Sequence, residues 1–319
     1  MVVAGDPDVG VLVVDRLDEQ AVRAVEALAG RAAEADGRPA LSDHTALHLR
    51  GGGDVGAWHL LARDGGGQVV GYAHLDPSDP VEGPSGEVVV DPRARGRGVG
   101  DRLLHRVVAL AQSEAGRAVR LWAHGDAPAA ARLARRHGFT RSRVLLQMRR
   151  GLAAPLPQPR VPDRVVVRTF RPGDDDQAWL EVNAQAFAHH PEQGAWTHGD
   201  LRARQAEPWF DPEGFFLAHR RDDDRLVGFH WTKRHGDGAG TGHGHAPLGE
   251  VYVVGVLPEE QGDGLGRALT LVGLQHLRDA GLPEAMLYVD EANDAAVRLY
   301  RRLGFRRHET DVMWRRPTT

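Results

Sequence analysis

The chain has 319 residues, a formal net charge of −4 and no cysteine. Its length exceeds the usual size of a single hydrophobic core, so two domains are expected. The small negative charge gives no general attraction to nucleic acid or to an anionic membrane, and the lack of cysteine excludes disulfides, thiolate metal ligands and a cysteine nucleophile. No apolar run reaches the length of a membrane helix and residues 1–10 lack a signal-peptide pattern, so we expect a cytoplasmic protein.

The hydrophobic pattern predicts one order of elements that occurs twice. In the first half we expect helices over residues 19–35, 43–50, 98–115 and 127–136, and strands over residues 57–63, 68–75, 87–90, 119–123 and 143–149. The helix over 98–115 is amphipathic, with Val99, Leu103, Val107 and Ala111 on one face. Residues 165–315 repeat this order, so both halves are expected to be mixed α/β units.

Internal repetition supports two domains. Gly98 and Gly264 lie 166 positions apart, and so do Gly100 and Gly266. Because this period is the size of a domain, it predicts two copies of one fold and not a short structural repeat. Four prolines in residues 151–163 predict a stiff connector. We therefore place the two domains at residues 1–150 and 164–319.

A glycine-rich turn follows the central strand of each copy. In the second copy the segment is EVYVVGVLPEEQGDGLG, residues 250–266. The first N–H groups of a helix have no partner inside the helix, and glycines let a ligand approach them closely. A phosphate or pyrophosphate is the natural ligand, although a turn that binds nothing explains the glycines equally well when they are taken alone.

Lys233 is the single lysine among forty basic side chains. A compact ammonium among arginines makes it a candidate binding residue, while a surface lysine retained by chance is an equal alternative. Histidines occur three times in the glycine-rich stretch 235–249, at His235, His243 and His245. We expect these to be mobile-loop histidines and not metal ligands, because no carboxylate cluster or fixed helical spacing accompanies them.

Two motifs recur in both copies. They are the turns Arg95-x-x-Gly98-x-Gly100 and Gln261-x-x-Gly264-x-Gly266, and the later segments AAARLARRHGF and AAVRLYRRLGF. This combination resembles the GNAT-type acyl-CoA N-acyltransferases. The strings AHHPEQGAWT, GFHWTK and LYVDEANDAAVRLYRRLGF resemble a family of tandem GNAT enzymes that acetylate the cysteinyl amine of a cysteinyl-glucosaminyl-inositol.

The resemblance implies an α/β fold of two tandem GNAT domains, each with a mixed central sheet flanked by helices. It implies acetyl-CoA as cosubstrate, a small-molecule amine as acceptor and no metal. Neither nucleic acid nor a membrane is expected as a partner, and we expect a monomer. Two other functions stay open: transfer to another small amine or a protein N-terminus, and a non-catalytic acyl-CoA-binding regulator.

Acetyl transfer to an amine needs a base for the amine, a donor for the thioester carbonyl and an acid for the leaving thiol. Glu250 is the one acid on the central strand of the second copy, and its even spacing from Val254 predicts that both share a face of the sheet. A solvent-facing glutamate is the alternative, and the resemblance favours the base. Tyr300 is the candidate acid because a phenol stays protonated at pH 7, while packing against Phe305 is its alternative.

The resemblance also implies residues for binding. The acceptor is expected at Asp43, Glu192, Lys233, Glu250 and Tyr288. The acetyl-CoA contacts are expected at Val88, Val89, Val90, Gly96, Arg97, Gly98, Val99, Gly100, Asp101, Val254, Gly255, Val256, Gln261, Gly262, Asp263, Gly264, Leu265, Gly266, Arg267, Asn293, Asp294, Ala295, Ala296, Val297 and Arg298. Two positions depart from the pattern. Asp43 is one methylene shorter than the glutamate expected there, and the carboxylate of Asp263 should weaken pyrophosphate binding unless it points outward.

The first copy lacks the proposed base and acid. At the offset of 166 positions Glu250 falls on Pro84, Tyr300 on Ala134 and Asn293 on Ala127. We therefore expect the first domain to bind acetyl-CoA without turning it over.

Overall fold

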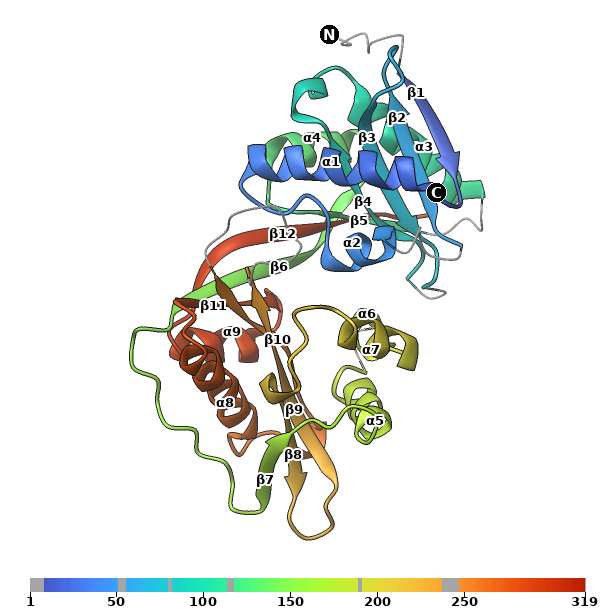
Figure 1. Cartoon of the computed structure of the whole chain (residues 1–319). Coiled ribbons are helices and arrows are strands. Elements are labelled where there is room, and N and C mark those ends of the chain that lie inside the picture. The colour runs from blue at the N-terminus through green and yellow to red at the C-terminus, as the bar shows by residue number, and fades with distance from the viewer. Residues whose placement is uncertain are drawn as a thin grey trace. The chain divides into compact units, whose positions relative to one another are not determined.

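A computed structural model describes residues 9–50, 56–79, 82–113, 118–188, 191–236 and 247–318 (Figure 1). The chain forms two compact units. The first unit consists of Met1–Leu145, Asp290–Ala292 and Glu309–Thr319, and the second consists of Leu146–Val289 and Asn293–His308. The predicted domains at 1–150 and 164–319 stay a prediction. The units differ from that division mainly because residues from Glu309 onward belong to the first unit.

The first unit is a mixed sheet with helices on both faces (Figure 1). Its elements are β1 (Gly10–Val14), α1 (Glu19–Asp36), α2 (Asp43–Arg50), β2 (Trp58–Arg63), β3 (Val69–Asp76), β4 (Ser85–Val90), η1 (Pro92–Ala94), α3 (Val99–Ser113), β5 (Val119–Ala123), α4 (Pro128–Arg136), the start of β6 (Thr140–Gly151) and most of β12 (Arg306–Arg316). The strand order is β1-β2-β3-β4-β5-β12-β6. Neighbours from β1 to β4 are antiparallel, β4 and β5 are parallel, and β12 runs antiparallel to β5.

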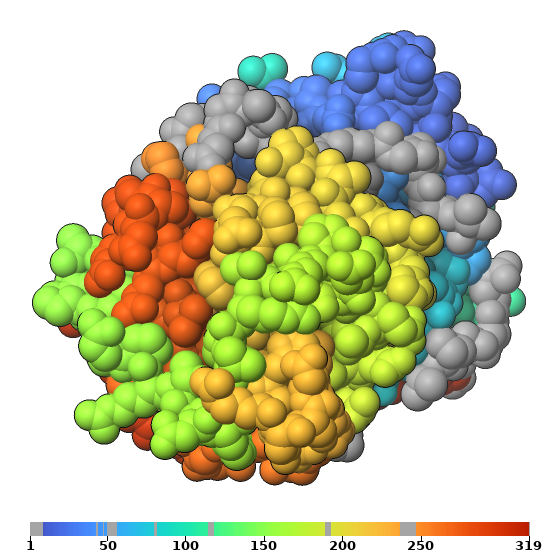
Figure 2. Space-filling model, turned by 60° about the horizontal axis from the view of Figure 1, so that its bottom comes forward, coloured from blue at the N-terminus to red at the C-terminus, as the bar shows by residue number. Residues whose placement is uncertain are grey.

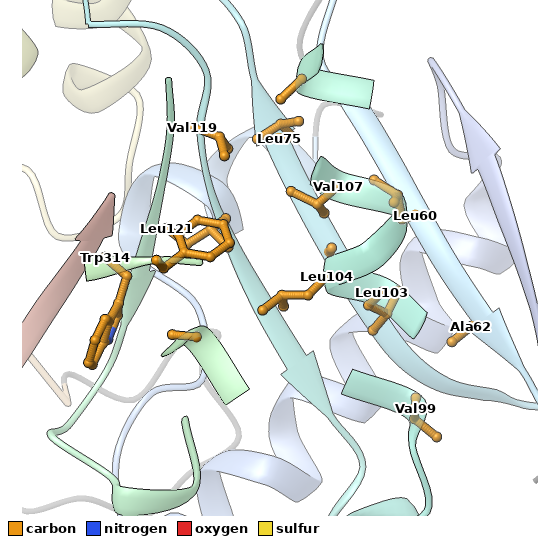
Figure 3. Close-up of a cluster of buried hydrophobic side chains, with 14 of the residues drawn as sticks. Leu60, Ala62, Leu75, Val99, Leu103, Leu104, Val107, Val119, Leu121 and Trp314 are labelled. Atoms are coloured by element: carbon orange, nitrogen blue, oxygen red, sulfur yellow. The ribbon is translucent and has the colours of Figure 1, made fainter. Parts of the chain in front are cut away.

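Helix α3 fills one face of this sheet, as its sequence predicts. Val99, Leu103, Val107 and Ala111 recur every four residues, and all four are buried. Figure 3 shows this core, in which Leu60, Leu75, Leu121 and Trp314 contribute from four strands. Helix α1 packs on the other face through residues that include Val25 and Leu28. Trp314 belongs to β12, so this hydrophobic core includes a residue from the end of the second sequence copy.

The second unit repeats the arrangement. Its elements are the remainder of β6, β7 (Val165–Thr169), α5 (Asp176–Ala186), α6 (Pro191–Gly194), α7 (His198–Gln205), η2 (Pro212–Gly214), β8 (Phe215–Arg220), β9 (Leu226–His235), β10 (Leu248–Val256), η3 (Pro258–Glu260), α8 (Leu265–Asp279), β11 (Glu284–Asp290) and α9 (Asp294–Arg302). The strand order is β6-β11-β10-β9-β8-β7, with β10 parallel to β11 and antiparallel to β9. Helices α5 and α7 form part of its surface and make the yellow-green area of Figure 2.

Aromatic rings form the centre of the second unit. Trp179 of α5 meets Trp231 of β9 edge-on at 5.8 Å between ring centroids, and Phe215 of β8 stacks on Trp231 at 4.5 Å. All three side chains are fully buried. These pairs fix α5 against the β8–β9 hairpin, which positions one wall of the site described below.

The opposite face of the second sheet packs closely on α8. His230 of β9 is fully buried, burial lowers its pKa to about 4, and its neutral ring donates from Nδ1 to the Leu269 carbonyl of α8 at 2.7 Å. Gly273 lies one turn further along α8, and a Cβ there would overlap the His230 ring. Glycine at 273 therefore permits the close approach of α8 to the sheet.

Replacing Gly273 with alanine is expected to lower the free energy of unfolding by about 1–3 kcal/mol, because the new methyl group overpacks a filled interface. The direction of this change is informative, since replacing glycine with alanine in a helix interior otherwise stabilises the helix by about 1 kcal/mol. Gly266→Ala in the same helix is the control. Its Cβ would lie 3.7 Å from Val256, an ordinary contact. Urea unfolding that shows equal or greater stability for Gly273→Ala would contradict the close packing.

Candidate active site

Glu250 and Lys233 lie opposite each other on neighbouring strands. They are register partners in the antiparallel pair of β10 and β9, and both are buried, with 5% and 6% of their surface exposed. The register shifts between Val251 and Val253, so Tyr252 is an extra residue in β10 and forms a β-bulge. Glu250 consequently shares a sheet face with Lys233, while Val254 points to the other face. The predicted common face of Glu250 and Val254 is wrong, because even spacing does not survive a bulge.

The ammonium of Lys233 rests against aromatic rings. It lies 4.8 Å from the centroid of Trp209 and 5.4 Å from that of Tyr252. Arg204 supports Tyr252 by donating from Nε to its hydroxyl at 3.0 Å. The site therefore places a desolvated cation and a buried carboxylate side by side on the face covered by α5 and α7. Burial rules out a surface lysine retained by chance.

His235 contacts Glu250 directly. It is the last residue of β9, and its Nε2 lies 2.7 Å from Oε2 of Glu250. The expectation that His235 belongs to a mobile loop is wrong, since it extends the strand on the same face as Lys233, two residues on. The glycine-rich sequence that follows His235 favoured a loop, so the sequence did not indicate that the strand extends to this residue. His243 and His245 lie outside the described residues.

The edge of β10 opens beyond Glu250. The parallel register of β10 and β11 runs from Leu248↔Glu284 to Val251↔Leu287 and ends there, although β10 continues to Val256. Within the described register the segment Val254–Val256 has no partner on β11. Such an edge can accept an extended ligand as an additional strand. The first unit has the same opening, because the register of β4 and β5 ends at Glu87↔Trp122 and leaves Val88–Val90.

The turn before α8 leaves room for an anion. Gly262 and Gly264 have φ angles of 106° and 96°, and a Cβ at either position would meet nothing within 4 Å. Helix α8 then begins at Leu265. The turn therefore fits a pyrophosphate, because both glycines leave open space around the backbone that leads into the N-terminus of the helix.

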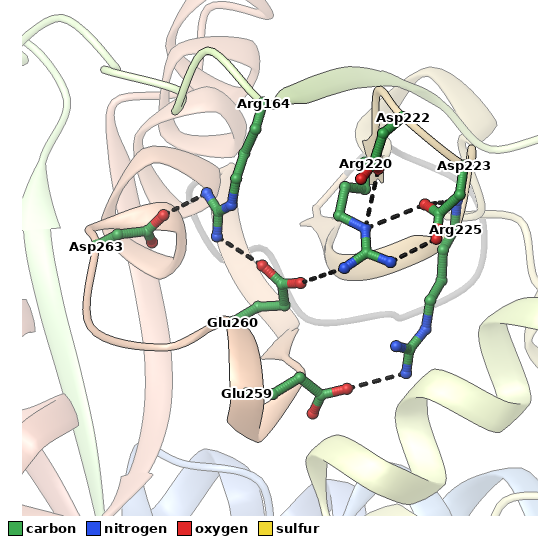
Figure 4. Close-up of polar contacts among 8 residues, drawn as sticks. All are labelled: Arg164, Arg220, Asp222, Asp223, Arg225, Glu259, Glu260 and Asp263. Atoms are coloured by element: carbon green, nitrogen blue, oxygen red, sulfur yellow. Dashed lines mark hydrogen bonds and ion pairs between the residues drawn. The ribbon is translucent and has the colours of Figure 1, made fainter.

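Asp263 is tied into this turn by two contacts. Its Oδ1 accepts from the Leu265 N–H at 3.2 Å, and its other oxygen pairs with Arg164 (Figure 4). Arg164 also donates to Glu260 at 2.6 Å. The carboxylate of Asp263 thus accepts from the first N–H of α8 and is balanced by an arginine, which explains why an acid is tolerated here.

Replacing Asp263 with asparagine is expected to strengthen acetyl-CoA binding about fivefold, because it removes a negative charge beside the phosphate position, worth about 1 kcal/mol. Asparagine keeps a side-chain oxygen that can accept from the Leu265 N–H. Titration calorimetry at low and high salt is the measurement, and the gain should shrink at high salt. Asp279→Asn, at the exposed C-terminal end of α8, is the control. Unchanged or weaker binding by Asp263→Asn would refute the effect.

Tyr300 lies on α9 with its side chain buried, and 7% of its surface is exposed. Its ring meets Phe305 edge-on at 5.9 Å, and burial raises its pKa to about 12. The packing interpretation and the acid interpretation are thus compatible, because the phenol stays protonated at neutral pH. Asn293 caps α9 by accepting from the Ala296 N–H at 3.1 Å. Arg298 is an exposed residue of the same helix.

Tyr288 lies on β11, half-exposed, and its hydroxyl accepts from Nε2 of Gln147 at 2.9 Å. It follows Met286 by two residues, and Met286 is the register partner of Glu250, so Tyr288 shares the face of Glu250. Asp43 begins α2 and Glu192 lies in α6. The side chains of both residues lie outside the described structure, so their roles stay predictions.

The first unit has a different polar cluster at the corresponding place. In the register of β3 and β4, Asp76 lies opposite Ser85, as Lys233 lies opposite Glu250 in the register of β9 and β10. Ser85, and not Pro84, is therefore the counterpart of Glu250. The bulge at Tyr252 accounts for the one-residue difference. Serine in place of glutamate leaves the first unit without this base, in line with the expected loss.

Glu87, His124 and Asp311 form a buried charged network in the first unit. His124 lies 3.4 Å from a carboxylate oxygen of each acid, and Glu87 also accepts from the Ser42 N–H at 2.8 Å. Burial disfavours the charges, but the carboxylates raise the pKa of His124 to about 10, and His124 and Ser42 lower that of Glu87 to about 2. Sequence reasoning missed this network, because its members are scattered over 224 positions of the chain between Glu87 and Asp311.

Two features are absent from the described residues. None of their helices is long and apolar enough to cross a membrane. No group of three or more histidine, aspartate or glutamate side chains among them could hold a metal ion.

Family models match both units. The acetyltransferase (GNAT) family matches residues 179–305, and an acetyltransferase (GNAT) domain matches residues 56–141. The chain is 60% identical over 293 residues to the mycothiol acetyltransferase of Thermobispora bispora, which covers 92% of this chain and 95% of that relative.

Solved structures share the architecture. A GCN5-related N-acetyltransferase from Sphaerobacter thermophilus has a TM-score of 0.69 at 27% identity, covering 97% of this chain and 96% of that one. A tandem GNAT protein from the clavulanic acid biosynthesis pathway has a TM-score of 0.72 at 19% identity, covering 98% and 99%, and shows a common fold.

The fold and the family models together define an acetyltransferase with two tandem GNAT domains, which confirms the expected fold class. GNAT acetyltransferases use acetyl-CoA as the acetyl donor. The chain belongs to the mycothiol acetyltransferase family, as the sequence motifs predict.

Proposed function

We propose that the chain transfers acetyl from acetyl-CoA to the cysteinyl amine of 1D-myo-inositol 2-(L-cysteinylamino)-2-deoxy-α-D-glucopyranoside, the last step of mycothiol biosynthesis. The observation that carries the proposal is the buried pair of Glu250 and Lys233 beside the open edge of β10. Family membership supplies the identity of the acceptor.

In this proposal Glu250 is the general base. An α-amino group has a pKa of roughly 7.7 to 8, so only about a tenth to a fifth of it is free amine at pH 7. Glu250 accepts the proton that the attacking amine must lose, directly or through one water. Lys233 donates hydrogen bonds to the hydroxyl-rich acceptor, and its contacts with Trp209 and Tyr252 hold the ammonium in place.

Acetyl-CoA supplies a thioester, which is the activated acetyl group. Backbone groups of Val254–Val256 bind its amide-bearing arm, and one N–H there polarises the thioester carbonyl. The turn from Gln261 to Arg267 holds the pyrophosphate. Asn293 and Arg298 stay proposed contacts from α9.

Tyr300 acts on the leaving sulfur. The gap between its pKa of about 12 and that of a thiol, about 8.5, corresponds to about 5 kcal/mol for complete proton transfer. Tyr300 therefore stabilises the thiolate chiefly by donating a hydrogen bond while the proton is transferred late.

We propose that the first unit binds acetyl-CoA through Val88–Val90 and Gly96–Asp101 without turnover. The supporting observations are its open β4 edge and the serine at the position of the base. In a Glu250→Gln, Tyr300→Phe double variant acetylation should be lost while acetyl-CoA still binds. A double variant with near wild-type turnover would show that the first unit is catalytic.

Two rival functions make different predictions. An acetyltransferase for another amine or a protein N-terminus would leave cysteinyl-glucosaminyl-inositol unmodified, and a non-catalytic regulator would release no thiol from acetyl-CoA with any amine. Mass spectrometry after incubation with acetyl-CoA and cysteinyl-glucosaminyl-inositol tests the proposal. A singly acetylated product supports it, and its absence defeats it. We further propose a monomer in the cytoplasm, with no nucleic acid or membrane partner.

A further inference from the structure

We propose that His235 positions the carboxylate of Glu250 for catalysis, an inference that rests on the proposed role of Glu250 as the base. The contact between His235 Nε2 and Glu250 Oε2, at 2.7 Å, carries the proposal. It is short and joins an imidazole to a carboxylate, which makes it a strong hydrogen bond when the ring donates.

The strands place both side chains on one face. Lys233 is the register partner of Glu250, and His235 follows Lys233 by two residues of β9. Within the described part of the chain, His235 supplies the one hydrogen bond made to the Glu250 carboxylate. Oε2 is therefore engaged and Oε1 is left for the amine.

Burial gives this contact its importance. The Glu250 side chain is 7% exposed, so water reaches the carboxylate little and a protein donor must satisfy and orient it. A misoriented base lowers kcat without weakening substrate binding, because other groups bind the acceptor. His235, whose own side chain is 30% exposed, reaches this buried carboxylate from the end of β9.

The geometry also assigns the tautomer. A ring that donates from Nε2 to a carboxylate carries a proton on Nε2. Nitrogen-15 NMR of the wild-type chain should therefore show His235 with its proton on Nε2, and Glu250→Gln should change that signal. A ring protonated on Nδ1 alone would overturn the assignment.

Two variants test the role in catalysis. His235→Ala removes the donor and is expected to lower kcat about 10- to 100-fold, while KM for both substrates stays within about twofold. His235→Gln retains an amide N–H with similar reach and should recover most of kcat. A wild-type kcat in His235→Ala, or a His235→Gln variant as slow as His235→Ala, would overturn the proposal. Circular dichroism and melting curves establish that both variants fold.

A double-mutant cycle separates this inference from the proposed function. If His235 acts through Glu250, His235→Ala should cause no further loss in a Glu250→Gln background. Full activity of Glu250→Gln would refute Glu250 as the base. An inactive Glu250→Gln together with additive losses in the double variant would refute the role of His235 alone.

Discussion

Replacing Glu250 with glutamine is expected to lower kcat by about 10²- to 10⁴-fold, the usual contribution of a general base. Glutamine keeps the shape of the side chain and accepts the hydrogen bond from His235, but it cannot take a proton at neutral pH. KM for acetyl-CoA should change little, because the cofactor-binding segments are untouched. Initial rates of thiol release measured over both substrate concentrations provide the test.

Glu181→Gln is the matched control. Glu181 lies on the exposed face of α5, so the same chemical change there should leave kcat unaffected. The deficit of Glu250→Gln relative to the wild type should also shrink as pH rises, since free amine becomes abundant above its pKa and needs no base. A Glu250→Gln variant with more than a tenth of wild-type kcat at pH 7 would exclude general-base catalysis by Glu250.

Replacing His124 with leucine is expected to lower the free energy of unfolding by about 3–5 kcal/mol. The change leaves the carboxylates of Glu87 and Asp311 buried without their cation, and an uncompensated buried charge costs about that much. Urea unfolding followed in the first unit, for example by hydrogen exchange of β4 and β5, measures the loss. His105→Leu on the exposed face of α3 should have little effect.

The pH dependence of the free energy of unfolding provides a second test of this network. The pKa of His124 is raised from 6.5 to about 10, so its stabilisation is complete below pH 6.5 and is lost as pH rises toward 10. The pKa of Glu87 is lowered from 4.5 to about 2, so its stabilisation is complete above pH 4.5 and is lost as pH falls toward 2. Wild-type stability should therefore fall from pH 6.5 to 10, and His124→Leu should lack most of that fall. Parallel pH curves for the two proteins would contradict the buried network.

Local patterns made much of the fold predictable. The spacing of Val99, Leu103 and Val107 identified α3, and the motif with Gly264 and Gly266 identified the turn, in which Gly264 has the positive φ angle that glycine favours. The constant offset between the copies then predicted two units of one type. These signals are local because they depend on helical periodicity and on backbone conformations that favour glycine.

The arrangement of the candidate site depended on features without a local signal. The bulge at Tyr252 reverses the face of Glu250, and neither strand's residue pattern marks an extra residue. The same shift makes Ser85 the counterpart of Glu250. His235 lies at the edge of a glycine-rich stretch, and only the strand register brings it to Glu250. Strand β1 was not predicted at all, since Gly10–Val14 is short and forms a sheet edge.

The assignment of β12 to the first unit bears on the order of folding. Val312–Arg316 pair with β5, Trp314 fills the first core, and Asp311 binds both His124 and the Gly125 N–H. A chain emerging from the ribosome presents residues 1–145 long before residue 309, so the nascent first unit lacks a strand, a core side chain and a counter-ion. In a chain truncated before Glu309, the amide hydrogens of β5 should exchange rapidly with solvent. A peptide of residues 306–316 added in trans should slow this exchange. The earlier-synthesised unit is thus completed only when residues 309–316 have been made, so its folding depends on the synthesis of the second unit.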